Sequence, residues 1–123
     1  PLLGICLGMQ LLCNSTEEGN TDCLGIIDLD VLKFDFENQK VPQIGWNNIY
    51  DLNSKIFSET NENDFIYMVH SYYILLSKFT IAKTKYGIEY SSAIKKDNFY
   101  GTQFHPEKSG LTGESIIKNF LEL

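Results

Sequence analysis

The pattern of apolar and polar positions divides the chain into short strands, with one helix near each end. Residues 2–5 form an apolar run typical of a buried parallel strand, and residues 7–13 have the apolar content of a short helix. The polar stretch 14–22 contains Gly19 and Asn20 and is typical of a surface loop. The chain is therefore expected to begin with a strand, a tight turn, a helix and a loop.

The middle of the chain favours β-structure. Partial alternation of apolar residues predicts a strand over 26–36, and a second strand is expected over 45–50. A short helical turn is expected at 55–57. Two runs rich in aromatic and β-branched residues, 65–76 and 80–94, predict antiparallel strands.

The last segment combines a strand with a closing helix. Residues 99–104 predict a strand that places His105 at its end, before Pro106 stops it. The helix is expected over 112–121, with Thr112 as its N-cap. Its apolar face is expected to consist of Ile116, Ile117, Phe120 and Leu121.

Length and charge restrict the classes of function. With 123 residues, 43% of them hydrophobic, the chain can bury one core, and we treat residues 1–123 as one domain. The formal charge of −6 argues against a nucleic-acid or anionic-membrane surface, because both require clustered Lys and Arg. No apolar run approaches the roughly 20 residues needed to cross a bilayer. We therefore expect a cytoplasmic protein whose partners are small molecules and proteins.

The three cysteines have no paired spacing. Cys6, Cys13 and Cys23 are an odd number, so neither a disulfide framework nor a zinc ribbon fits. Cys13 is most simply a buried small residue and Cys23 a loop thiol. We expect no metal and no cofactor.

Cys6 lies between Gly4 and Gly8, in the pattern of a nucleophile elbow with cysteine in place of serine. Both glycines are expected because a strand that turns sharply into a helix brings these two positions too close for side chains. The elbow would place the sulfur at a helix N-terminus, whose dipole stabilises a thiolate and lowers the pKa of Cys6. The backbone N–H of Leu7 would face the oxyanion formed during attack on a carbonyl. The pattern alone also fits a buried structural cysteine.

A cysteine nucleophile needs a base, and the chain has two histidines. Glu107 stands two residues after His105, where its carboxylate can accept the proton of the ring nitrogen that faces away from the sulfur. A His-Pro-Glu turn alone also fits a structural role, but joined to the elbow it indicates a Cys–His–Glu triad. The order nucleophile, histidine, acid differs from that of α/β-hydrolases. His70, in an apolar run, is interpreted first as a hydrogen-bonded core histidine and second as a catalytic one.

Two motifs together point to a family. The segments Gly4-Ile5-Cys6-Leu7-Gly8-Met9-Gln10 and Gln103-Phe104-His105-Pro106-Glu107 resemble those of class I, or triad, glutamine amidotransferases. More narrowly, the chain resembles glutaminase subunits of imidazole glycerol phosphate synthase in Gly45-Trp46-Asn47, Val69-His70-Ser71-Tyr72, Tyr86-Gly87 and His105-Pro106-Glu107-Lys108-Ser109. The resemblance is weakest over 53–64. It implies an α/β fold, a mixed β-sheet flanked by helices.

The resemblance also implies roles for individual residues. Cys6 would be the nucleophile, His105 the general base and later acid, and Glu107 the carboxylate that orients it. The reaction implied is hydrolysis of glutamine to glutamate and ammonia through a thioester, with ammonia passed to a synthase (cyclase) subunit in a heterodimer. The residues that would hold glutamine are Gln10, Ser71 and Tyr72.

A further set of residues matches positions at or near the synthase interface of that family. Trp46 could instead be a core aromatic, and Lys108 a solvated surface charge. Gln43 stands where the family often has histidine, which leaves the synthase partner open. The expected interface residues are Gln43, Gly45, Trp46, Asn47, Tyr67 and Lys108.

Other interpretations remain open at the level of sequence. Paralogous subunits supply ammonia for amination of surface-polysaccharide sugars, a related γ-glutamyl thiol hydrolase would release its product to water, and a non-enzymatic subunit would keep the motifs without activity. The chain begins at Pro1 and enters an apolar strand at once. We therefore expect it to be the C-terminal part of a domain whose N-terminal strands complete the sheet, and the resemblance implies that these strands also complete the oxyanion hole. Residues 1–123 alone are expected to have little or no glutaminase activity.

Overall fold

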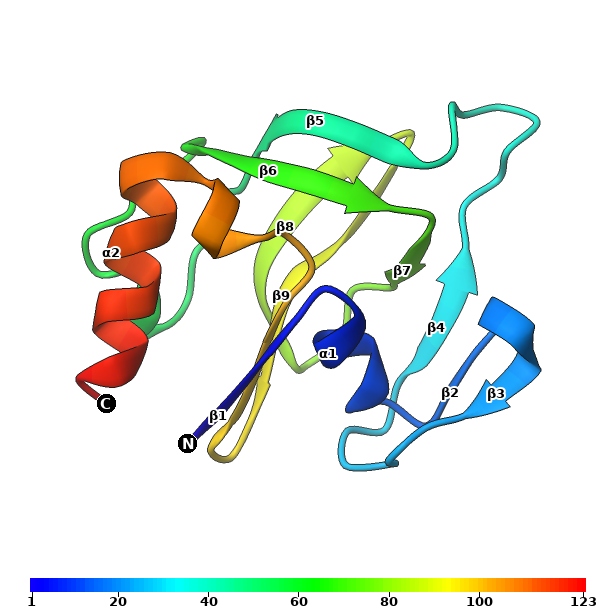
Figure 1. Ribbon diagram of the computed structural model, residues 1–123, viewed down its shortest axis with the longest axis horizontal. Coiled ribbons are helices and arrows are strands. Elements are labelled where there is room, and N and C mark those ends of the chain that lie inside the picture. Colours follow the sequence, from blue (N-terminus) through cyan, green and yellow to red (C-terminus); the bar gives the residue numbers. More distant parts are fainter.

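The computed structural model describes residues 1–123 and contains short strands with two α-helices (Figure 1). Strand β1 (Leu2–Ile5) leads into helix α1 (Leu7–Leu11), and helix α2 (Gly110–Leu121) closes the chain. Three turns of 3₁₀ helix are η1 (Glu18–Asn20), η2 (Lys55–Phe57) and η3 (Pro106–Lys108). The other strands are β2 (Ser15–Thr16), β3 (Thr21–Asp22), β4 (Asp30–Lys33), β5 (Gln43–Asn48), β6 (Phe65–His70), β7 (Tyr72–Ile74), β8 (Thr80–Tyr86), β9 (Ile88–Lys96) and β10 (Phe99–Thr102).

The central sheet brings the two ends of the chain together. Its strand order is β1-β10-β9-β8, with β1 parallel to β10 and the remaining pairs antiparallel. In the parallel pair Ile5 lies opposite Thr102, so both strands end at the same level. The residues that follow, Cys6 and Gln103, are therefore neighbours although 97 positions separate them. This mixed sheet with its helices confirms the expected α/β class.

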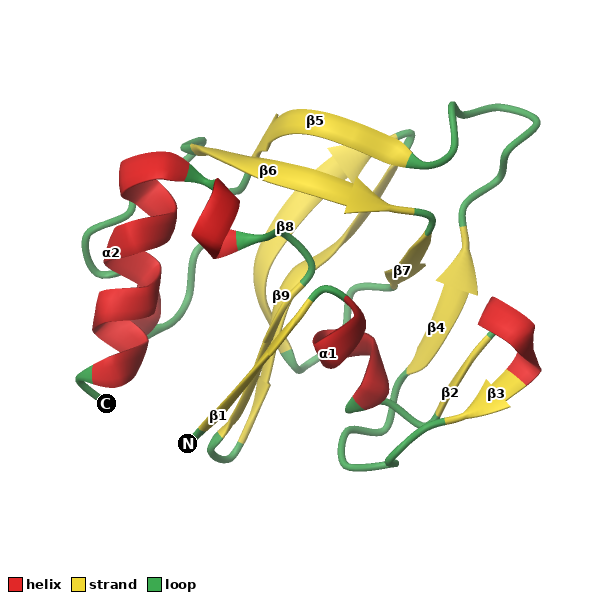
Figure 2. Ribbon diagram, viewed as in Figure 1, coloured by secondary structure: helices red, strands yellow, loops and turns green.

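Two smaller sheets complete the fold. Strands β5 and β6 form an antiparallel pair, and β3-β2-β4-β7 form a sheet on the side of the molecule away from α2 (Figure 2). The expected strand over 26–36 is confirmed only over β4. The expected loop over 14–22 is wrong in part, since it contains the β2–β3 hairpin. The run 65–76 is interrupted at Ser71, because β6 and β7 pair with different sheets.

Helix α2 ends at Leu121, as predicted, but differs from the prediction in where it begins and in which residues it buries. It begins at Gly110 after Ser109, which makes no side-chain capping bond, so Thr112 is not the N-cap. Ile116 is fully buried, but Leu121 is 75% exposed and belongs to the outer side of the helix. The predicted four-residue buried face is therefore wrong in part. Leu111, Ile117 and Leu121 instead line an open groove of about 770 Å³.

The buried side chains form two clusters. The larger one lies between the β5–β6 pair, the β8–β9 hairpin and α2, and includes Met68 and Tyr90. The smaller one lies beneath α1, where Met9 and Cys13 pack against Ile94. Cys13 is fully buried, as expected, and the cysteines form no disulfide. No helix is both long and apolar enough to span a bilayer.

Candidate active site

The elbow around Cys6 is a sharp turn between β1 and α1. Cys6 has a positive φ of 54°, and its backbone N–H donates to the Thr102 carbonyl at 2.7 Å. A Cβ added to Gly4 would lie 2.5 Å from the carbonyl oxygen of Gly8, so a side chain cannot fit there. A Cβ added to Gly8 would meet no atom within 4 Å. The steric explanation for the motif is confirmed for Gly4 and wrong for Gly8.

The sulfur of Cys6 is half-buried, and this determines its protonation. Burial raises the pKa of the Cys6 thiol above its ordinary value, and the charges of Glu107 and Glu18 add to the rise. The Leu7 N–H and the Gln103 side chain lower it by hydrogen bonding, but burial is the larger effect. The predicted net lowering of the Cys6 pKa is therefore wrong, because the loss of solvent outweighs the hydrogen bonds that favour the thiolate. Cys6 is a thiol at rest and needs a base.

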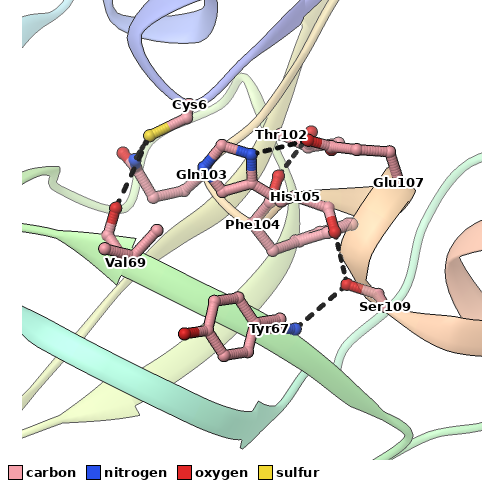
Figure 3. A network of polar contacts seen from close by, with 9 residues as sticks. All are labelled: Cys6, Tyr67, Val69, Thr102, Gln103, Phe104, His105, Glu107 and Ser109. Carbon is pink, nitrogen blue, oxygen red and sulfur yellow. Dashed lines mark hydrogen bonds and ion pairs between the residues drawn. The ribbon is translucent and has the colours of Figure 1, made fainter.

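Figure 3 shows the candidate base and its carboxylate. His105 Nδ1 lies 2.9 Å from Glu107 Oε2, which leaves Nε2 of the ring for Cys6 (Figure 3). The cysteine S–H instead donates to the Val69 carbonyl at 3.7 Å. The backbone N–H of His105 donates to the Tyr67 carbonyl at 3.1 Å, which ties the histidine to β6. The fold thus gathers the three predicted triad residues at the carboxyl ends of β1 and β10.

A cleft of about 230 Å³ opens beside the sulfur. Gln10, Ser71 and Tyr72, expected to hold glutamine, all line it. It also contains the carboxylate residue Glu18, which the sequence analysis missed because η1 lies within an expected surface loop. The lining residues are Cys6, Leu7, Gln10, Glu18, Val69, His70, Ser71 and Tyr72.

The ring of His70 is fully engaged at the base of this cleft. Its Nδ1 lies 2.7 Å from the Tyr72 carbonyl oxygen and must carry the proton. Its unprotonated Nε2 can only accept, so the Gln43 carboxamide 2.8 Å away must turn its nitrogen to the ring, and the Tyr90 hydroxyl lies 3.2 Å away. Burial lowers the pKa of His70 to about 4, so the ring is neutral near pH 7. These contacts agree with the first interpretation of His70, a hydrogen-bonded core histidine.

The β5–β6 pair has one exposed apolar face and one buried face. Trp46 is 56% exposed and lies opposite Tyr67, with the two rings edge to face at 5.8 Å. Ile44 and Phe65 share this exposed face and were missed by the sequence analysis. We call these four residues, Ile44, Trp46, Phe65 and Tyr67, the apolar face.

The remaining residues expected at an interface lie elsewhere. Gln43 is 3% exposed and points toward His70, on the opposite side of the pair. Asn47 donates from Nδ2 to the Lys85 carbonyl at 3.1 Å. Gly45 adds no side chain to the apolar face, and Lys108 is exposed on η3. A partner bound to the apolar face would therefore not touch the Gln43 side chain directly.

The model of the family described as glutamine amidotransferase class-I matches residues 1–123. The chain belongs to this family. Among curated relatives, imidazole glycerol phosphate synthase subunit HisH of Bacteroides fragilis is 58% identical over 125 residues, covering 100% of this chain and 64% of that protein. The subunit of the same name from Escherichia coli K12 is 47% identical over the same shares. This amidotransferase chain spans about 64% of the length of these relatives.

Solved structures agree at the level of the fold. A glutamine amidotransferase of Thermotoga maritima is 22% identical with a TM-score of 0.63, covering 99% of this chain and 47% of the other. The glutaminase domain of Trypanosoma brucei CTPS is 20% identical with a TM-score of 0.65, covering 99% and 60%. At these identities the likeness establishes the amidotransferase fold of this chain.

Proposed function

We propose that the chain forms part of the glutaminase subunit of imidazole glycerol phosphate synthase, which hydrolyses glutamine and passes ammonia to a synthase subunit. The observation that carries this proposal is the convergence of Cys6 and the His105–Glu107 pair at the carboxyl ends of β1 and β10, with a small cleft beside the sulfur. The 47–58% identity to subunits of that name supports the choice among amidotransferases. The free thiols support a reducing compartment, the cytoplasm.

The cleft offers groups that suit an amino-acid substrate. The Glu18 carboxylate lies at its edge, where it can pair with the α-ammonium group of glutamine. The side-chain nitrogen of Gln10 donates to the Tyr72 and Gln103 oxygens, so its carbonyl oxygen remains as an acceptor for the substrate. The cleft of about 230 Å³ is smaller than the roughly 300–1,000 Å³ typical of larger ligands. Substrate recognition is therefore assigned to Gln10, Glu18, Ser71 and Tyr72.

The first half-reaction forms a thioester. Nε2 of His105 takes the proton of the Cys6 thiol, and the sulfur attacks the carboxamide carbon of glutamine. The Leu7 N–H stabilises the negative oxygen of the tetrahedral intermediate. The C–N bond then breaks, and the imidazolium of His105 gives its proton to the departing nitrogen, which leaves as ammonia. Glu107 holds the ring orientation and stabilises its positive charge.

The second half-reaction regenerates the cysteine. His105 takes a proton from a water molecule, whose oxygen attacks the thioester carbon. The C–S bond breaks, glutamate is released, and the sulfur recovers its proton from the imidazolium. One glutamine and one water thus give one glutamate and one ammonia.

The apolar face is proposed to contact the synthase subunit. Its residues lie on the strand pair whose β6 supplies the Val69 carbonyl that contacts the Cys6 sulfur. A partner bound there would cover Trp46 and lie beside the cleft, so ammonia could pass without release to solvent. Lys108 is exposed on η3, which packs beside β6, and is proposed to meet an acidic group of the partner.

Glutaminase assays of the full-length protein, with and without a cyclase partner, test this function. We expect partner-dependent glutamate release that Cys6→Ala abolishes. Equal activity without any partner would favour the γ-glutamyl hydrolase, and activity retained by Cys6→Ala would refute the nucleophile. Stimulation by a sugar-aminating partner and not by a cyclase would assign the subunit to polysaccharide amination.

A substitution pair tests the proposed interface. Trp46→Ala is expected to weaken the complex at least tenfold, because exposed aromatic residues are frequent binding hot spots. Phe36→Ala is the control, since Phe36 is 65% exposed but lies outside the apolar face. Titration calorimetry that gives equal affinities for both variants would contradict the assignment.

A further inference from the structure

The side chain of Gln103 is fully buried against the cysteine nucleophile. Its Nε2 lies 3.6 Å from Cys6 Sγ, within the distance of a hydrogen bond to sulfur (Figure 3). Its Oε1 accepts a hydrogen bond from Gln10 Nε2 at 3.0 Å. The carboxamide therefore bridges the residue that reacts and a residue that lines the cleft.

A chain of hydrogen bonds determines which end of Gln103 faces the sulfur. The Tyr72 carbonyl can only accept, so the Gln10 atom 3.3 Å from it must be the nitrogen. That nitrogen lies 3.0 Å from the Gln103 carboxamide and requires an oxygen there. The other end of the carboxamide, toward Cys6, is then an N–H group. The reversed amide would place two donors together and turn an oxygen toward the sulfur.

We propose that Gln103 is a positioning residue for the nucleophile: its carboxamide, held in one orientation by Gln10 and the Tyr72 carbonyl, donates a hydrogen bond to the Cys6 thiolate. The proposal rests on the function proposed above, in which that thiolate attacks glutamine. His105 removes the proton, whereas Gln103 stabilises the charge that remains. Gln103 stands two residues before His105, in the same motif as the candidate base and its carboxylate.

The contacts of the sulfur with Val69 and with Gln103 change in opposite directions when the proton leaves. The thiol donates to the Val69 carbonyl at 3.7 Å, and a thiolate has no proton to donate there. The N–H of Gln103 meets a full negative charge after deprotonation, and hydrogen bonds to charged acceptors are stronger. Deprotonation therefore favours movement of the sulfur away from Val69 and toward Gln103. The hydrogen bond from Gln103 opposes the effect of burial on the pKa of Cys6.

The same hydrogen bonds connect the thiolate to the substrate. A substrate N–H bound to the free carbonyl of Gln10 would polarise the Gln10 amide, and with it the bond to Gln103. Binding of glutamine is thus expected to strengthen donation to the sulfur. Glu18 acts in the other direction, because its charge disfavours the thiolate until a substrate ammonium group neutralises it.

Alkylation of Cys6 by iodoacetamide as a function of pH measures the thiolate directly. Peptide mass spectrometry distinguishes Cys6 from Cys13 and Cys23 in the full-length protein. Gln103→Met keeps the size of the side chain and removes the donor, and is expected to raise the midpoint of the profile by about one pH unit, a tenfold loss of thiolate at neutral pH. Gln103→Glu places a carboxylate next to the sulfur and is expected to raise the midpoint of the profile further. In the glutaminase assay Gln103→Met should lower kcat with little change in KM.

The controls separate positioning from general damage. Ser92 is the control, because its backbone carbonyl accepts the backbone N–H of Gln103 while its buried hydroxyl has no hydrogen-bond partner. Ser92→Ala should therefore leave the midpoint of the alkylation profile unchanged. If Gln103→Met does not fold, Gln10→Met releases the carboxamide of an intact Gln103 and is expected to raise the midpoint by a smaller amount. An unchanged midpoint in folded Gln103→Met would overturn the proposal. If Gln103→Met does not fold, an unchanged midpoint in Gln10→Met would overturn it. Glutaminase activity of Cys6→Ala would overturn the proposed function and leave the alkylation result standing.

Discussion

Ser109 Oγ donates a hydrogen bond to the carbonyl oxygen of His105 at 2.6 Å. The same hydroxyl accepts the backbone N–H of Tyr67 at 3.0 Å, and the Tyr67 carbonyl in turn accepts the N–H of His105 at 3.1 Å. Ser109 is 2% exposed, so solvent does not compete for these bonds. The candidate base is therefore fixed to the backbone of Tyr67, whose ring packs on Trp46 in the apolar face. Movement of β6 on partner binding would move His105 as well.

Substitution of Ser109 by alanine tests this attachment. The change leaves the Tyr67 N–H without its partner in a buried site, so the free energy of unfolding should fall by about 1–3 kcal/mol. Urea denaturation measures this value. Ser115→Ala is the control, because its hydroxyl donates only to the Thr112 carbonyl within α2. Similar losses for both variants would contradict a special role of Ser109.

The two glycines of the elbow should respond differently to alanine. Gly4→Ala forces a Cβ to within 2.5 Å of the Gly8 carbonyl oxygen and should destabilise residues 1–123 by about 1–3 kcal/mol or more. Gly8→Ala meets no atom within 4 Å and lies inside α1, where alanine is favoured over glycine by about 0.5–1 kcal/mol. Thermal unfolding of the two variants checks the contrast. Equal destabilisation would show that both positions are crowded.

Much of the fold that carries the triad could be predicted from local sequence. The strand–cysteine–helix segment and the strand that ends before His105 follow from short apolar runs bounded by Gly and Pro. The break at Ser71 could not, because 65–76 contains no Gly or Pro and its apolar character continues through the break. Pairing decides it: β6 joins β5, whereas β7 joins β4. Pairing partners are properties of the folded chain.

The site shows the same division between local and distant information. Cys6, His105 and Glu107 lie in compact motifs, so their chemistry is visible in the sequence. Glu18 reaches the cleft only because η1 folds back beside it, and its segment was expected to be a surface loop. Ile44 could also have been predicted to lie on the apolar face, since residues two apart on a strand share a face and Ile44 stands two residues before Trp46.

Substitution of Glu107 should lower glutaminase turnover and, at the same time, increase the fraction of Cys6 thiolate. Glu107→Gln removes the charge that stabilises the imidazolium, so glutaminase kcat should fall by about 100-fold. The same charge raises the pKa of Cys6, so its loss should shift the alkylation midpoint of Cys6 to lower pH. Glu122→Gln, an exposed carboxylate change at the end of α2, serves as control. Parallel loss of thiolate and turnover would contradict this separation of roles.

The buried ring of His70 predicts a loss of stability in acid. Burial lowers the pKa of His70 to about 4 in the folded protein, whereas an exposed histidine in the unfolded chain titrates near 6.5. Above pH 6.5 both states are neutral and His70 contributes no pH dependence. Between pH 6.5 and about 4 the unfolded state binds a proton that the folded state does not, so stability falls by about 1.4 kcal/mol per pH unit, about 3 kcal/mol in total.

Comparison with His70→Gln isolates this effect from the titration of carboxylates. Glutamine keeps hydrogen-bonding groups near the Tyr72 carbonyl and Gln43 but has no proton to gain. The native protein should be the more stable of the two at pH 7, and its advantage should shrink by about 3 kcal/mol between pH 7 and pH 4. Urea denaturation at several pH values gives the two curves. Parallel curves would mean that His70 is already protonated in the folded state, and that Gln43 and Tyr90 stabilise an imidazolium rather than a neutral ring.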